Sequence, residues 1–134
     1  DHAAPINLAW ARDNHTTGIR IPISGPAARR VENRLAGMDC NPYLCIAASL
    51  ACGLLGLEDA QMPLDEAQGD AYEGESDIPQ VLGDALDLFE EATRLHEVLH
   101  PDFARVYSIV KRAEYEEFLQ VISPWEREHL LLNV

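Results

Sequence analysis

Basic residues, cysteines and long apolar runs are all scarce in this chain of 134 residues. It carries 10 Lys and Arg against 23 Asp and Glu, a formal net charge of −13, and Lys111 is its single lysine. A surface of that sign repels nucleic acid and anionic lipid, so we expect neither as a partner. The apolar segment 43–57 is shorter than the ~20 residues that cross a bilayer, and the start of the chain has no signal-peptide pattern.

The few cysteines do not have the spacing of a zinc finger or of a redox motif. They stand at Cys40, Cys45 and Cys52. Cys45 and Cys52 lie seven residues apart in a predicted helix, which predicts that both are small hydrophobes on one buried face. An odd number of cysteines in an acidic chain indicates a reducing compartment, so we expect the protein in the cytoplasm.

The most informative stretch is residues 27–34, Ala-Ala-Arg-Arg-Val-Glu-Asn-Arg. In an extended strand alternate side chains share a face, so Arg30, Glu32 and Arg34 are expected to point the same way, roughly 7 Å apart. A carboxylate is a ligand for Mg²⁺ or Mn²⁺, and a guanidinium binds a phosphate or a carboxylate through two donors. That combination suits phosphoryl transfer. The alternative is a salt bridge on a solvent-exposed strand face, and the octet alone favours it.

Two strands and a long helix are predicted in the first half of the chain. Alternating apolar and polar residues predict neighbouring strands at 19–23 and 29–35, separated by a turn at Gly25-Pro26. Asn41 and Pro42 then predict the start of a helix. Because residues 43–57 are apolar on every side, we expect this helix to be buried.

The second half of the chain is predicted to be helical. Residues 58–77 are rich in Asp, Glu, Gly and Pro, which is typical of a loop. Helices are expected from about residue 78, from Pro101, and after a capping box at Ser123. The fold class is therefore α+β: a short β-strand pair at the N-terminal side followed by a mainly α-helical region. The length indicates one domain, residues 1–134.

The segments on either side of the octet change its interpretation. Residues 14–22 read Asn-His-Thr-Thr-Gly-Ile-Arg-Ile-Pro, and residues 39–44 read Asp-Cys-Asn-Pro-Tyr-Leu. With the octet they resemble the glutamine synthetase family, which has Asn-Arg-(Ser/Thr) running into Ile-Arg-Ile-Pro, then Arg-Arg-x-Glu-x-Arg, then Asn-Pro-Tyr-Leu. The resemblance continues through Ile78-Pro79 and Ser123-Pro124-Trp125-Glu126. The chain looks like a fragment, the C-terminal part, of the catalytic domain of such an enzyme.

This resemblance implies an activity. Family members join ammonia or an amine to the side-chain carboxylate of glutamate at the expense of ATP, through a γ-glutamyl phosphate intermediate. They use two divalent cations, Mg²⁺ or Mn²⁺, and a neighbouring subunit completes the substrate site. We therefore expect glutamate, ATP and ammonia or a small amine as partners, and a homo-oligomer in the full-length protein. The segment alone is expected to be inactive.

The resemblance also implies roles for particular residues. Glu32 matches a metal ligand, and Arg20 matches a catalytic arginine that stabilises the transferring phosphoryl group. Arg34 matches an arginine that holds glutamate, and Arg30 matches one near the nucleotide phosphates. His15 stands where the family usually carries an arginine as a second phosphate contact. A neutral histidine would supply less positive charge there.

Three alternatives stay open beside glutamine synthetase itself. Residues 35–42 and the ending Ser-Pro-Trp-Glu look more like members that ligate glutamate to putrescine or other polyamines, so a γ-glutamyl-polyamine synthetase also fits. A non-catalytic remnant that acts in subunit interaction is a candidate from another class. A zinc hydrolase is the third, because His96-Glu97-Val98-Leu99-His100 fits the His-Glu-x-x-His pattern. We rank it below the others, since Pro101 ends the helix there and the helix dipole accounts for histidines in a last turn.

Overall fold

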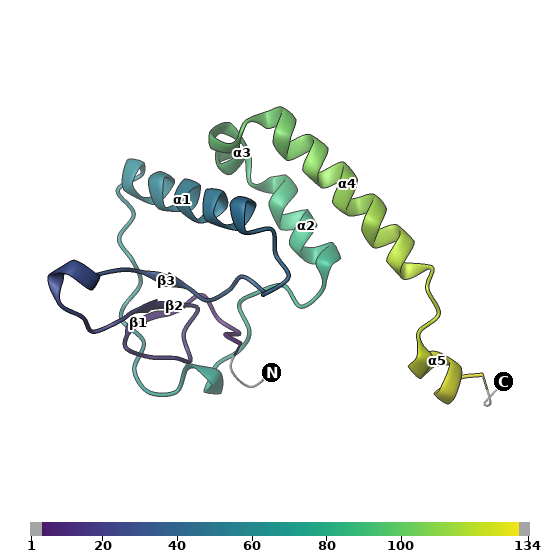
Figure 1. Ribbon diagram of the computed structural model, residues 1–134, viewed down its shortest axis with the longest axis horizontal. Helices are drawn as coiled ribbons and strands as arrows, with labels where there is room; N and C mark the ends of the chain where they lie inside the picture. Colours follow the sequence, from purple (N-terminus) through teal and green to yellow (C-terminus); the bar gives the residue numbers. More distant parts are fainter. Residues whose placement is uncertain (1–3, 132–134) are drawn as a thin grey trace. The chain divides into compact units, whose positions relative to one another are not determined.

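The computed structural model describes residues 4–131, and the chain divides into two compact units, residues 1–79 and 80–134. The first unit holds β1 (Trp10–Arg12), β2 (Ile19–Ile21), the 3₁₀ turn η1 (Pro26–Ala28), β3 (Glu32–Asn33), α1 (Pro42–Glu58) and the 3₁₀ turn η2 (Ala71–Glu73). The second holds α2 (Leu82–Glu91), α3 (Thr93–Leu99), α4 (Pro101–Leu119) and α5 (Pro124–His129) (Figure 1). The α+β class is confirmed, with the strands at the N-terminal side and the helices after them. One domain over residues 1–134 stays a prediction.

The three strands form one sheet in the order β1-β2-β3. β2 pairs antiparallel with β3, and Arg20 lies directly opposite Glu32. The two predicted strands are therefore neighbours, as expected, but both are shorter than predicted. β2 ends before Pro22, which has no N–H to donate to a neighbouring strand. β1 was not predicted, because three residues are too few to show a period.

A tight return loop, residues 13–18, joins β1 to β2, and these two strands run parallel. Parallel strands usually need a connection of about a dozen residues or more. Here Asp13 takes a left-handed conformation with φ 51°, and the buried amide of Asn7 holds the loop from inside. The amide donates to the carbonyl of Thr16 at 3.1 Å and accepts from the N–H of Gly18 at 3.3 Å. Side-chain hydrogen bonds thus replace the usual crossover helix.

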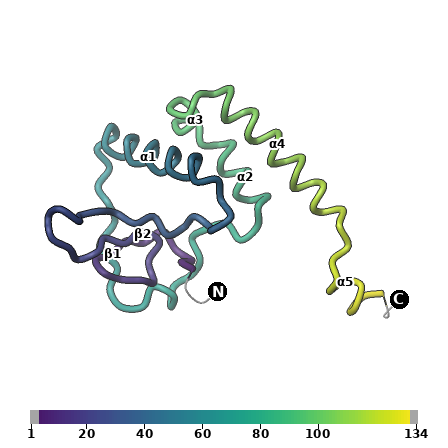
Figure 2. Tube along the Cα trace, in the orientation of Figure 1, coloured from purple at the N-terminus to yellow at the C-terminus, as the bar shows by residue number. Residues whose placement is uncertain are grey.

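The predicted loop at residues 58–77 is largely confirmed. α1 ends at Glu58, and after it the loop contains only the short turn η2. It runs back past β1 (Figure 2). The N–H of Ala67 donates to the carbonyl of Trp10 at 3.0 Å, and the Trp10 indole donates to the carbonyl of Leu64 at 2.6 Å. The loop therefore lies against the β1 edge of the sheet.

Helix α1 begins as predicted, but its environment differs from the prediction. The Asn41 side chain accepts from the N–H groups of Tyr43 and Leu44 at 3.0 and 3.3 Å. Of the helix's residues only Ala51 is buried, and Cys45 is half-buried. The predictions of a buried helix and of a buried Cys45–Cys52 face are therefore wrong, because a helix apolar on all sides needs partners on all sides. The exposed large apolar side chains of α1 are Tyr43, Ile46, Leu50, Leu54 and Leu57.

In the second unit α4 packs on α2, with α3 between them in the chain. Leu86 and Ala104 are buried, and the ring of Phe89 meets that of Tyr107 edge-on at 5.5 Å. The helices from Pro101 and after Ser123 are confirmed. α2 begins at Leu82, later than predicted, since the residue before it is still extended.

No helix among residues 4–131 combines the length and the hydropathy that a membrane span requires.

We expect Gly18→Ala to destabilise the first unit. A Cβ at Gly18 would lie 2.3 Å from the carbonyl oxygen of Asn7, which is backbone and cannot turn aside. Thermal unfolding should show that the free energy of unfolding falls by about 1–3 kcal/mol. Gly25→Ala is the control, because its φ is −65° and nothing lies within 4 Å of its Cβ. Its stability should stay within about 0.5 kcal/mol of the wild type. Equal melting temperatures for both variants would contradict the close approach at Gly18.

Candidate functional site

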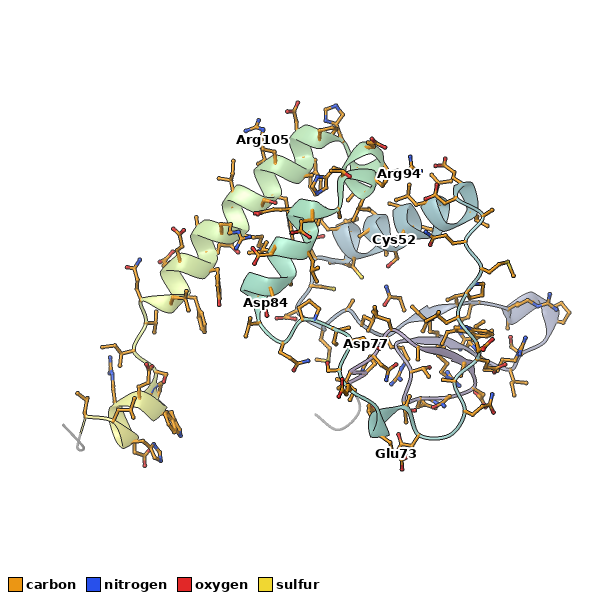
Figure 3. All side chains as sticks on the ribbon, turned by 180° about the vertical axis from the view of Figure 1, so that it is seen from behind. Cys52, Glu73, Asp77, Asp84, Arg94 and Arg105 are labelled. Atoms are coloured by element: carbon orange, nitrogen blue, oxygen red, sulfur yellow. The ribbon has the colours of Figure 1, made fainter. Side chains whose placement is uncertain are left out.

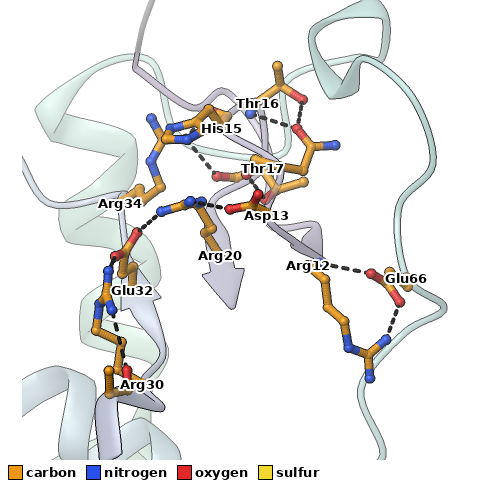
Figure 4. A network of polar contacts seen from close by, with 12 residues as sticks. Arg12, Asp13, His15, Thr16, Thr17, Arg20, Arg30, Glu32, Arg34 and Glu66 are labelled. Atoms are coloured by element: carbon orange, nitrogen blue, oxygen red, sulfur yellow. Dashed lines mark hydrogen bonds and ion pairs between the residues drawn. The ribbon is translucent and has the colours of Figure 1, made fainter. Parts of the chain in front are cut away.

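The site is built on the cross-strand pair Arg20 and Glu32 (Figure 4). Arg20 Nη1 donates to Glu32 Oε2 at 2.8 Å, and Arg20 Nη2 donates to Asp13. The Arg20 side chain is 13% exposed and that of Glu32 is 28% exposed, so water screens this pair only in part. Arg20 Nε is buried and has no hydrogen-bond partner among the described residues. Arg20 thus bonds two carboxylates and keeps its buried Nε–H unused.

Glu32 holds a second guanidinium, that of Arg30. Arg30 Nε donates to Glu32 Oε1 at 2.9 Å, and Nη2 lies 2.7 Å from the same oxygen. The hydrogen bond from Arg20, supported by Arg30, lowers the pKa of Glu32. The bonds to Glu32 and Asp13 raise the pKa of Arg20. The Glu32 carboxylate and the Arg20 guanidinium are therefore both charged at neutral pH. Arg30 and Glu32 point the same way, as expected, and they form the salt bridge that the alternative interpretation of the octet describes.

Arg34 turns toward the return loop (Figure 4). Its Nη1 donates to the carbonyl of His15, and to that of Thr17 at 3.3 Å. Its backbone N–H donates to the carbonyl of Gly18 at 2.9 Å. His15 is an exposed residue. Side chains thus join Arg20, Glu32 and Arg30, whereas Arg34 meets the main chain of His15 and not its ring.

Asp13 is the member of the cluster that the sequence did not predict. It follows β1 directly, and its left-handed φ of 51° starts the return loop. Asn14 continues the turn, because its side chain accepts from the N–H of Thr16 at 2.9 Å. The Asp13-Asn14 pair is a turn signal and could have marked the loop. It could not have shown that Asp13 meets Arg20.

A divalent cation finds no complete set of ligands here. No group of three or more His, Cys, Asp or Glu side chains among residues 4–131 could hold a metal ion. Both oxygens of Glu32 already accept from guanidiniums. Since Mg²⁺ takes about six oxygen ligands, the described residues do not by themselves fit this cofactor, and Glu32 is the ligand that the family resemblance assigns to them.

The two histidines of the His-Glu-x-x-His pattern lie at helix ends and have other partners. His96, in the last turn of α3, has its Nε2 2.7 Å from the carbonyl oxygen of Phe89, and its ring packs on the Phe89 ring at 4.9 Å. His100 follows α3 with φ 77° and caps α4, accepting at Nδ1 from the N–H of Asp102 at 3.3 Å. The pair therefore does not stand on one helical face. That they bind no zinc stays a prediction.

Comparison with known proteins agrees with this arrangement. Residues 1–130 match the family model described as glutamine synthetase, catalytic domain. The chain belongs to the glutamine synthetase family. It is 32% identical to the glutamine synthetase of Halobacterium salinarum, over 97% of this chain and 31% of that protein. It is 38% identical to the gamma-glutamylputrescine synthetase of Escherichia coli, over 96% and 28%, and 35% identical to a glutamate–isopropylamine ligase of Pseudomonas sp, over 90% and 27%.

The family model matches nearly all of this chain, residues 1–130, but the chain covers only part of each relative. The chain spans about 30% of the length of the relatives it matches, 27% to 31% in these three. The matched part of the family's catalytic domain consists here of one three-stranded sheet and the helices that follow it.

We expect Glu32→Gln to flatten the acid end of the stability profile. Because the pKa of Glu32 is lowered in the folded state, its ion pairs stabilise the fold above the unfolded-state pKa, and this contribution is lost as pH falls through the folded-state pKa. The melting temperature of the wild type should therefore drop more steeply than that of Glu32→Gln below about pH 4.5. Glu75→Gln, in the exposed loop, should follow the wild type. Parallel profiles for wild type and Glu32→Gln would mean that these ion pairs add nothing to stability.

Proposed function

We propose that this chain is part of an ATP-dependent ligase that joins ammonia or a small amine to the side-chain carboxylate of glutamate, through γ-glutamyl phosphate. The observation that carries the proposal is the family match over residues 1–130 together with the ion-paired cluster at the Arg-Arg-x-Glu-x-Arg motif. Its relatives named above are glutamate ligases by their names. The substrates of the reaction are then glutamate, ATP and the amine.

Each arginine of the cluster has a proposed anion. Arg20 stabilises the transferring phosphoryl group, Arg30 binds the nucleotide phosphates, and Arg34 binds glutamate. A guanidinium suits all three, because its fork of donors matches phosphate and carboxylate oxygens. Arg34 uses Nη1 on backbone carbonyls, which holds the guanidinium in place. His15 lies beside it as the second phosphate contact.

The exposure of the two carboxylates points to the contact of Arg20 that gives way to a phosphate. Asp13 is 49% exposed at its side chain and Glu32 is 28% exposed, and Arg20 is bonded to both. We propose that the phosphoryl group takes the place of Asp13, because the more hydrated carboxylate loses less on release. Preorganised donors then stabilise the charge of the transferring group without rearranging solvent.

The cation and the assembly are proposed on the family's account. Mg²⁺ or Mn²⁺ would take Glu32 as one ligand, with the other ligands supplied from outside the described residues. A homo-oligomer in the cytoplasm is the proposed form of the full-length protein, in which a neighbouring subunit completes the substrate site.

The choice of amine stays open between ammonia and a polyamine. The family match covers both kinds of enzyme, since the relatives named above include a glutamine synthetase and a gamma-glutamylputrescine synthetase. Parallel assays of the full-length gene product with ammonia, putrescine and longer polyamines separate the two. Absence of activity with every amine, in a protein that folds and binds ATP, would favour the non-catalytic remnant.

We expect the purified 134 residues to have no ligase activity. No group of three or more His, Cys, Asp or Glu side chains among residues 4–131 could hold a metal ion, and Glu32 alone does not organise two cations. Phosphate release from ATP and formation of γ-glutamyl product should stay at the background of the uncatalysed mixture, while the full-length gene product turns over. Ligation of glutamate by the 134 residues alone would show that they form a complete site.

We expect Glu32→Ala in the full-length protein to lower kcat by ~10² to 10⁴, because it removes both the proposed ligand and the group that positions Arg20 and Arg30. Steady-state kinetics with a metal titration measure this. The control is Glu114→Ala, which breaks an exposed pair with Lys111 on α4 and should leave kcat unchanged. A wild-type rate in Glu32→Ala would make Glu32 a salt-bridge partner only.

A further inference from the structure

Two cysteines flank the N-terminus of α1. Asn41 is the N-cap and Pro42 the first helical residue, so Cys40 stands just before the cap and Cys45 is the fourth residue of the helix. These are the two positions at which apolar side chains meet in a hydrophobic staple. The N–H of Cys45 donates to the carbonyl of Asn41 at 2.9 Å, which fixes the turn between them. Cys40 and Cys45 thus stand at the two ends of the first helical turn of α1.

We propose that Cys40 and Cys45 form a thiol pair that an oxidised low-molecular-weight disulfide converts, reversibly, into an intrachain disulfide at the start of α1. Both cysteines are free; Cys40 is exposed and Cys45 is half-buried. A small oxidant therefore reaches Cys40 first. The site goes beyond the proposed ligase function and does not depend on it.

Helix geometry leaves no other pair within reach. Cys52 lies seven residues beyond Cys45 on the same helix (Figure 3), a rise of about 10 Å at 1.5 Å per residue. A disulfide needs Cα atoms within about 7 Å. Cys52 is therefore too far from Cys45, and it serves as an internal control.

The reaction is an ordinary thiol–disulfide exchange. The Cys40 thiolate attacks one sulfur of the oxidant, the oxidant's S–S bond breaks, and its other half leaves as a thiol. The Cys45 thiolate then attacks the Cys40 sulfur of the mixed disulfide and releases the second thiol. Two cysteine thiols are oxidised, one disulfide of the oxidant is reduced, and both protons end on the released thiols.

The environment of Cys40 makes this exchange dependent on pH. Loss of hydration and the contact with Cys45 raise the pKa of the Cys40 thiol. Because only the thiolate attacks, the rate should rise about tenfold per pH unit below that pKa.

The disulfide would fix the start of α1, a helix that the strand cluster already contacts. Asn33 of β3 donates to the hydroxyl of Ser49 on α1 at 3.0 Å. A Cys40–Cys45 bond closes a loop of six residues at the start of the helix and so removes conformational entropy from the unfolded chain. Oxidation therefore stabilises the folded state of this unit.

Peptide mapping of the full chain tests the proposal. The reduced chain is incubated with glutathione disulfide at pH 7 and pH 8, then alkylated and digested with chymotrypsin without reduction. Cleavage after Tyr43 and Leu50 separates the three cysteines, so a Cys40–Cys45 bond appears as two linked peptides lighter by two hydrogen atoms. We expect this species in the wild type and in Cys52→Ser, formed roughly tenfold faster at pH 8. It should vanish in Cys40→Ser and in Cys45→Ser.

A second readout separates the disulfide from simple thiol modification. Oxidised wild type and oxidised Cys52→Ser should melt several degrees higher than their reduced forms, and dithiothreitol should abolish the difference. Oxidised Cys40→Ser should melt like its reduced form. Mixed disulfides alone on Cys40 or Cys45, a Cys45–Cys52 bond, or only dimers linked between chains would each overturn the proposal.

Discussion

The first unit depends on the return loop that turns the chain from β1 back to the start of β2. Six residues do what a crossover helix does in most parallel pairs. This connection is possible because the Asn7 side-chain amide donates and accepts hydrogen bonds inside the loop. The hydroxyl of the fully buried Thr17 also donates to the carbonyl of Ile19 at 2.9 Å. The loop in turn determines which groups come into contact: it places Asp13 against Arg20 and the carbonyl of His15 against Arg34.

The cluster shows why arginine, and not lysine, fills these positions. Arg20 divides its two Nη groups between two carboxylates, and Arg30 uses Nε and Nη2 on one oxygen of Glu32. A single ammonium offers no such planar fork with fixed directions. The same rigidity lets one strand pair present several guanidiniums in fixed positions. The side chains that support the structure are thus the same ones for which we propose anion binding.

Local features were predictable from the sequence, and features that need distant partners were not. The cap at Asn41, the helix from Pro101 and the capping box at Ser123 depend on residues within one turn of each other, and the structure has all three. The β2–β3 pairing was predictable because the two strands follow one another in the sequence and Gly25-Pro26 signals a turn between them. β1 and the partnership of Asp13 with Arg20 depend on a parallel pairing that no local pattern signals.

The burial of α1 failed for a related reason. Its composition describes a helix with neighbours on every side, whereas this chain spans only about 30% of its relatives' length. Periodicity reports what a helix can bury, not what lies beside it in a given chain. The roles of Arg20, Arg30, Arg34, His15 and Glu32 stay predictions drawn from the family, since the geometry shows how these residues meet and not what they bind.

The exposed apolar side of α1 also sets how copies of the chain behave toward one another. The exposed apolar side chains of Tyr43, Leu50 and Leu57 favour association, while the net charge of −13 makes copies of the chain repel one another at neutral pH. That repulsion vanishes near the isoelectric point of about 4.6 and weakens as salt shortens the Debye length. Colloidal behaviour therefore follows from one uncovered helix and the charge around it: mild acid or high ionic strength removes the barrier to self-association.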